Sequence, residues 1–249
     1  MSDSSWITET DHGGIRHMVL NASPVNALRA DGLMGFADLI CAAEADKTIR
    51  AIVISSGCKV FSAGLDLKAA SEFNQDEQRQ IVDGLNHAFL QLFACPKPVI
   101  TAVNGAALAG GLFFVLAADH RVASPRASFG LAEVRVGVDF PVGPMEIARA
   151  TLSPNDLRRL MLSGQPIGVE AAQDAGIVDR IVPQEGLINA ALQDAATFAA
   201  IPPKAYAAVK RQIRSETIQN IHTQMQVTRK EWFLPETRTA MRAMIKGKS

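Results

Sequence analysis

An uncharged run from Pro98 to Ala118 is the feature that most constrains the fold. It is long enough for a helix to span a bilayer. Glycines interrupt it, however, at Gly105, Gly110 and Gly111, and its β-branched first half differs from its alanine- and leucine-rich second half. This pattern predicts a buried strand, a glycine loop and a buried helix over residues 112–118 rather than a membrane span.

Short apolar segments and amphipathic segments alternate as far as Pro183. In residues 29–45, for example, Leu33, Phe36 and Ile40 recur at spacings of three and four, which predicts a helix. The other segments predict strands over 14–21, 51–55, 121–123 and 128–130 and a helix over 76–93. Alternating strands and helices predict an α/β layer architecture.

Strand signals fade after Gly186, and helical segments follow over residues 190–200, 204–214 and 219–230. We therefore expect an α/β core over residues 1–195 and a helical region over 196–249, which would serve oligomerisation or form a lid.

Composition narrows the classes of function. Basic and acidic residues number 25 each, so no net charge attracts nucleic acid. The N-terminus lacks the basic flank and apolar run of a signal peptide. Cys41, Cys58 and Cys95 lie far apart, the five histidines have no metal-binding spacing, and no GxSxG motif is present. We expect a cytoplasmic protein with reduced thiols, no metal, and neither nucleic acid nor membrane as a partner.

Two glycine turns offer backbone amides for an anion. Ala63 and Gly64 allow an unusual backbone conformation that would aim the Leu65 N–H inward. Gly110 and Gly111 stand where the predicted helix begins, and the unpaired amides of a helix start favour negative charge. Each turn alone is more often only a tight turn.

Several motifs together resemble the enoyl-CoA hydratase/isomerase (crotonase) family. They are VFSAGLDLK at 60–68, PVITAVNG at 98–105 leading into AGG at 109–111, FGLAE at 129–133, and residues 171–183 followed by Lys210. Their order and spacing match the family along nearly the whole chain. The resemblance implies a spiral of ββα turns with a helical C-terminal region, assembled as homotrimers or dimers of trimers.

The resemblance also implies an acyl-CoA thioester as substrate, with coenzyme A entering as part of that substrate and no separate cofactor. It places oxyanion donors at the amides of Leu65 and Gly110. Lys68, Arg29 or basic residues of the C-terminal helices would contact the phosphates. The substrate-binding residues implied are Ala63, Gly64, Asp66, Lys68, Ala109, Gly111, Phe113, Asp139 and Phe140.

Glu133 matches the family's acid/base carboxylate. Burial in an apolar pocket would raise its pKa and suit it to proton transfer near neutral pH. The alternative for an isolated glutamate is an ordinary surface or salt-bridged position.

Hydratases of the family carry a second glutamate where this chain has Phe113, which can neither accept a proton nor hold a water. We therefore rank double-bond isomerisation above hydration. Asp139 and, more weakly, Glu146 are candidates for a second carboxylate. Decarboxylation, carbon–carbon cleavage and an acyl-CoA-binding protein with weak activity remain alternatives.

Overall fold

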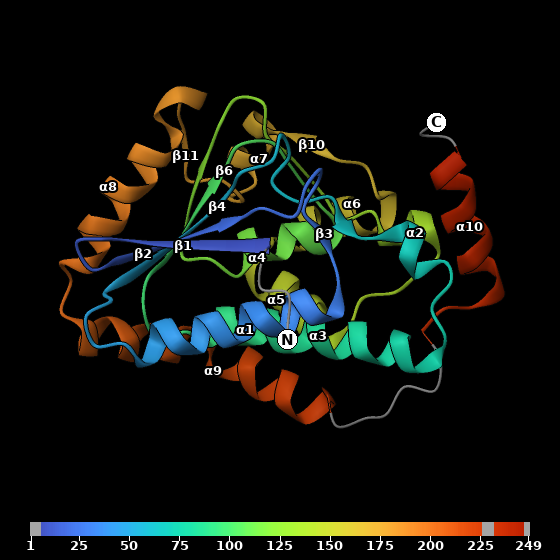
Figure 1. Cartoon of the computed structure of the whole chain (residues 1–249), viewed down its shortest axis with the longest axis horizontal. Helices are drawn as coiled ribbons and strands as arrows, with labels where there is room; N and C mark the ends of the chain where they lie inside the picture. Colours follow the sequence, from blue (N-terminus) through green and yellow to red (C-terminus); the bar gives the residue numbers. More distant parts are fainter. Residues whose placement is uncertain (1–5, 226–231, 247–249) are drawn as a thin grey trace.

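The computed structural model describes residues 6–225 and 232–246, and a six-stranded sheet forms its centre (Figure 1). The strand order is β1-β2-β4-β6-β8-β11, and all neighbours are parallel except β1 and β2, which form an antiparallel hairpin. The strands are β1 (Ile7–His12), β2 (Ile15–Leu20), β4 (Ala51–Ser56), β6 (Val99–Val103), β8 (His120–Ala123) and β11 (Arg180–Ile181).

Shorter strands form a second layer. After β4, β6 and β8 the chain adds one short strand and then a helix, so the ββα turn repeats along the sequence. These strands pair as β3-β5 and as β10-β9-β7. They are β3 (Ala27–Leu28), β5 (Gly64–Leu65), β7 (Ala106–Leu108), β9 (Ser128–Gly130) and β10 (Ile167–Gly168). The predicted α/β layer architecture is confirmed.

Helices cover both faces of the main sheet. In β4, Ile52 and Ile54 point into the larger core, whereas Ala51 and Val53 pack with α8 on the other face. Burial on both faces explains why this strand reads as a continuous apolar run. The α-helices are α1 (Ala30–Ala45), α2 (Leu67–Ala70), α3 (Gln75–Ala94), α4 (Phe113–Leu116), α5 (Val142–Thr151), α6 (Pro154–Ser163), α7 (Val169–Asp174), α8 (Leu187–Ala199), α9 (Pro203–Met225) and α10 (Pro235–Lys246).

The apolar run from Pro98 to Ala118 forms β6, β7 and a buried helical turn. The helix predicted over 112–118 has different bounds: the chain first forms the 3-10 helix η2 (Ala109–Leu112), and α4 then ends at Leu116. No helix in the described ranges is long and apolar enough to cross a membrane.

The C-terminal helices differ from the prediction. The helices predicted over 204–214 and 219–225 are one continuous helix, α9, because no glycine or proline interrupts the segment between them; residues 226–230 lie outside the described residues. Strand β1 and helix α10 were not predicted, since both segments are polar and largely exposed.

Buried ion pairs fasten α9 to the start of β6. The Nζ of Lys210 lies 2.6 Å from Asp119 Oδ2, and Arg214 lies 2.8 Å from the other carboxylate oxygen. The same Asp119 accepts a hydrogen bond from the backbone N–H of Val99 at 2.8 Å. Lys210 is therefore a structural cation and is not available at the surface for a phosphate.

Candidate active site

The two glycine turns predicted to carry the amides are in contact. Gly64 adopts φ +78°, in the left-handed region that favours glycine. A Cβ at this position would lie 2.8 Å from the Leu108 carbonyl oxygen, 2.8 Å from the Ala109 Cβ and 3.1 Å from the Gly110 nitrogen. Any side chain at residue 64 would therefore push the turns apart.

Each turn leaves one amide without a partner in its own element. Directly after β5, the Asp66 N–H donates to the Leu28 carbonyl of β3 at 3.3 Å. Because successive N–H groups of a strand point to opposite edges, the Leu65 N–H faces away from β3. Gly110 lies in the first turn of η2, where N–H groups have no acceptor within the helix.

One mainly apolar pocket includes Leu65, Gly110 and Glu133 in its lining. It encloses about 780 Å³ of space, including its open mouth. The other lining residues are Ala63, Leu67, Leu85, Leu108, Ala109, Phe113, Ala132, Val136, Val138, Phe140, Pro141, Pro144, Trp232, Met241 and Met244. Segments separated by more than half of the chain thus meet around one space.

Glu133 begins the 3-10 helix η3 (Glu133–Val136) and is 8% exposed. Its Oε2 atom is buried and has no hydrogen-bond partner among the described residues. Burial raises the pKa of this carboxyl to about 8, and a backbone hydrogen bond opposes the shift. Such a group can exchange a proton near neutral pH.

Phe113, the first residue of α4, also lines the pocket. Its side chain is 1% exposed and meets the ring of Phe140 edge to face, with 6.2 Å between the centroids. The other candidate carboxylates do not line the pocket: Asp139 accepts a hydrogen bond from the indole Nε1 of Trp232 at 3.0 Å, and Glu146 is paired with Arg149 at 2.5 Å.

Four more of the predicted binding residues lie outside the pocket lining, namely Gly64, Asp66, Lys68 and Gly111. Asp66 caps α2 by accepting a hydrogen bond from the Ala69 N–H at 3.1 Å. Lys68 is exposed on α2, and Gly111 packs on Ser62. Arg29 is also exposed and lies 3.6 Å from Asp31.

The C-terminal segment supplies a pocket wall that the sequence analysis missed. Trp232, Met241 and Met244 line the pocket, and the Thr237 hydroxyl donates to the Gly137 carbonyl at 2.6 Å. The only sequence signal is the three-residue spacing of the two methionines, which is weak in a polar helix. In Figure 1, α10 stands beside α2 at the end of the molecule that holds the pocket.

Ser62 has a structural role that its sequence context did not indicate. Its hydroxyl donates to the Asn26 carbonyl at 2.8 Å and accepts from the Gly64 N–H at 3.2 Å. The Asn26 side chain in turn donates to the Phe61 carbonyl at 2.8 Å. These buried bonds hold the first turn against β3.

A model of the enoyl-CoA hydratase/isomerase family matches residues 10–242. The chain belongs to this family. Carnitinyl-CoA dehydratases of Citrobacter koseri and of Escherichia coli K12 are each 33% identical to it over 216 residues, which cover 86% of this chain and 82% of theirs.

Solved structures of family members have the same fold. An enoyl-CoA hydratase/isomerase of Xanthobacter autotrophicus superposes with a TM-score of 0.84 at 26% identity, covering 98% of this chain and 97% of its own. An enoyl-CoA hydratase of Mycobacterium ulcerans gives 0.82 at 26%, covering 96% and 99%. The predicted crotonase-like fold is confirmed, and the chain is an enzyme of the crotonase superfamily that acts on an acyl-CoA.

Proposed function

We propose that this enzyme moves the double bond of a 3-enoyl-CoA to the 2-position, with Glu133 as the acid/base. The observation that carries this proposal is that Glu133 is the only ionisable side chain among the described residues that line the pocket. One carboxylate is sufficient for a proton shuttle, whereas orienting a water for addition is better served by two.

In the proposed reaction, the ionised Glu133 takes a proton from C2, and the electron pair of that C–H bond moves onto the thioester carbonyl to give an enolate. The enolate oxygen accepts hydrogen bonds from the amides of Leu65 and Gly110. As the enolate collapses, the C2–C3 double bond forms, the C3–C4 double bond breaks, and its electron pair takes the proton from Glu133 at C4. No atom is gained or lost, and the carboxylate is regenerated.

The two amides would supply much of the rate enhancement. Removing one such donor typically costs about 3 to 4 kcal/mol of transition-state stabilisation. Contact between the turns supports this role, because rigid donors need no rearrangement as charge develops.

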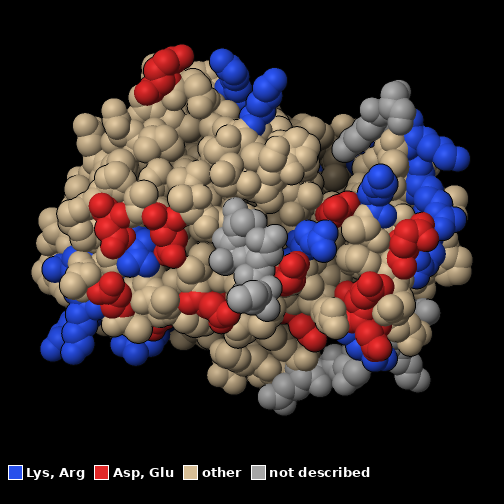
Figure 2. All heavy atoms as spheres, viewed as in Figure 1, with Lys and Arg blue, Asp and Glu red and all other residues tan. Residues whose placement is uncertain are grey.

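Basic side chains lie at the protein surface near the pocket and are candidates to bind the coenzyme A part of the substrate. Arg242 and Lys246 are exposed on α10, whose Lys and Arg side chains occupy the right edge of Figure 2. We propose that these groups, with Lys68 of α2, meet the phosphates, and that no further cofactor takes part.

Hydration or dehydration is the second candidate, favoured by the names of the carnitinyl-CoA dehydratase relatives. Phe113 argues against it, since this side chain stands where hydratases of the family carry a second glutamate and can neither accept a proton nor hold a water. Decarboxylation and carbon–carbon cleavage use the same enolate and are outcomes that the experiment below distinguishes.

Mass spectrometry of 3-enoyl-CoA and 2-enoyl-CoA incubated in deuterated water tests the proposal. Wild type should interconvert the two isomers and exchange the C2 proton without adding the mass of water. Glu133→Gln should lower both rates at least about a hundredfold. A gain of one water by 2-enoyl-CoA, or full activity in the variant, would contradict it.

A further inference from the structure

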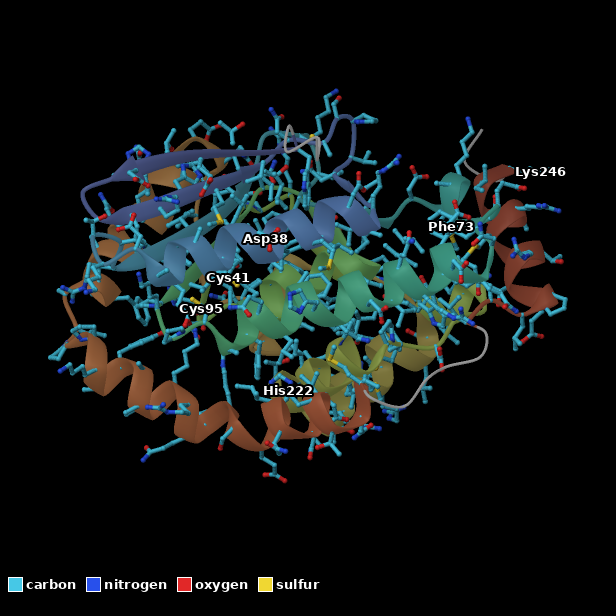
Figure 3. The ribbon with its side chains drawn as sticks, turned by 60° about the horizontal axis from the view of Figure 1, so that its bottom comes forward. Asp38, Cys41, Phe73, Cys95, His222 and Lys246 are labelled. Atoms are coloured by element: carbon cyan, nitrogen blue, oxygen red, sulfur yellow. The ribbon has the colours of Figure 1, made fainter. Side chains whose placement is uncertain are left out.

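A second cleft lies at the opposite end of the main sheet. Two of its lining segments, 44–50 and 96–98, directly precede β4 and β6, and a third, 198–206, joins α8 to α9, whereas the glycine turns of the active site follow the ends of β4 and β6. Cys41 and Cys95 mark this end of α1 and α3 in Figure 3, and Phe73 and Lys246 mark the active-site end. The cleft encloses about 720 Å³, part of it open to solvent.

Two cations tie the walls of the cleft together. Lys97 donates from Nζ to the carbonyls of Ala43 and Asp46, each at 2.6 Å, at the end of α1. Arg50 donates from Nη2 to the carbonyls of Ala199 and Ile201, at 2.9 and 3.3 Å, at the end of α8. Both side chains are thereby held in place, as preorganised binding groups require.

Arg50 and Lys47 retain donor groups that can bind an anion. No protein acceptor in the described ranges is bonded to the Nε and Nη1 atoms of Arg50, and Lys47 beside it has no ion-pair partner there. Within the part of the chain that the structure describes, Glu44 is the only acidic residue lining the cleft. Three cations and one acid therefore line this cleft, and desolvation lowers the pKa of Lys97, with the nearby Asp46 and Glu44 carboxylates opposing the shift.

The rest of the lining is apolar and partly aromatic. Phe198 and Tyr206 meet edge to face, with 6.3 Å between centroids and 89° between planes. Ile49, Pro96, Pro98, Ile201 and Pro203 complete the lining. Aromatic and proline surfaces favour a flat apolar body, and a guanidinium with two unused donors favours a carboxylate or phosphate.

We propose that this cleft is a second binding site, for a small organic anion that joins a flat apolar ring to a carboxylate or phosphate. The site goes beyond the proposed isomerisation and needs no group of the active site. Arg50 and Lys47 bind the anionic head, and Phe198 and Tyr206 contact the ring.

Titration with benzoate, followed by protein NMR in the full chain, tests the site. Benzoate should bind with shifts in residues around Phe198, and benzamide, the neutral analogue of the same shape, at least tenfold more weakly. Saturation with butyryl-CoA should leave the benzoate affinity unchanged. Phenyl phosphate in place of benzoate separates a phosphate head from a carboxylate head.

Two variants test whether benzoate binds in this cleft. Lys47→Met should weaken benzoate binding at least threefold, and Phe198→Ala at least fivefold, while Lys59→Met, which removes an exposed lysine outside the cleft, should not change it. Absence of benzoate and phenyl phosphate binding, equal affinity for benzamide, displacement by butyryl-CoA, or unchanged affinity in both cleft variants would each overturn the proposal.

Discussion

The burial of Glu133 determines the pH range in which this carboxyl can act as a base. Burial raises its pKa to about 8, so the carboxyl is mostly protonated at neutral pH. We expect kcat/KM for 3-enoyl-CoA to rise about tenfold per pH unit up to about pH 8 and then to level, because only the ionised form removes the C2 proton. Initial rates across this range measure the profile; a flat profile between about pH 6 and 8 would assign the base elsewhere.

The same shift predicts a pH-dependent stability. Between the ordinary pKa of 4.5 and the folded value of about 8, the native state holds a proton that the unfolded state has lost, so stability falls as pH rises through this window. Glu133→Gln removes the penalty. We expect the variant to be more stable than wild type by roughly 3 to 5 kcal/mol at about pH 9 and similar to it at about pH 4. Urea unfolding at both pH values measures the difference.

Gly64 is required by both conformation and space. Alanine there would need φ +78° and would contact Leu108 and Ala109 at 2.8 Å. We expect Gly64→Ala to lower kcat at least about tenfold by moving the Leu65 amide, and to lower stability by about 1 to 3 kcal/mol. Gly35→Ala is the control, since nothing lies within 4 Å of a Cβ there in α1; equal kinetics of the two variants would refute the steric argument.

At the scale of elements, the segment that ends in α10 completes the pocket. The Trp232 indole donates to the backbone and side-chain oxygens of Asp139 at 3.2 and 3.0 Å, which fixes the ring on the loop between η3 and α5. We expect Trp232→Phe to raise KM for enoyl-CoAs several-fold with a smaller effect on kcat, because the wall loosens while Glu133 stays in place. Steady-state kinetics on several chain lengths measures both constants.

Trp6→Phe is the matched control for Trp232→Phe. The indole of Trp6 also donates to a backbone carbonyl, that of Gly32 at 3.1 Å, but Trp6 does not line the pocket. An equal rise of KM in both variants would mean that general loosening, rather than the C-terminal wall, is responsible.

The positions of the helices and strands could be predicted from the sequence better than the contacts between them. The strand–glycine–helix order of residues 98–118 follows from local composition, and so does the α/β class. Contact between Gly64 and Gly110 depends instead on backbone hydrogen bonds between the segment before β5 and β7, such as that from the Leu108 N–H to the Ser62 carbonyl at 2.9 Å, and so short a pairing leaves no pattern in the sequence. Helix α10 carries Met241, Met244 and Ile245 on a largely polar background, so its role as a wall required coordinates.

For the whole molecule, we propose assembly through the region that follows residue 195, as homotrimers or dimers of trimers. Val209 and Ile213 lie one turn apart on α9 and are 54% and 75% exposed, which is unusual for large apolar side chains. We expect Ile213→Glu to reduce the mass measured by light scattering to that of a monomer. A monomeric wild type, or an unchanged mass in the variant, would contradict the proposal.

The C-terminal wall also has a consequence for biosynthesis. Residues 232–246 are the last described part of the chain, and they close a pocket whose other walls begin at Ala63. A chain synthesised only as far as α9 can therefore form the sheet before it can enclose a substrate. Catalysis should begin only after Trp232 and α10 have joined the rest of the fold, and products that stop before residue 232 should leave thioesters untouched.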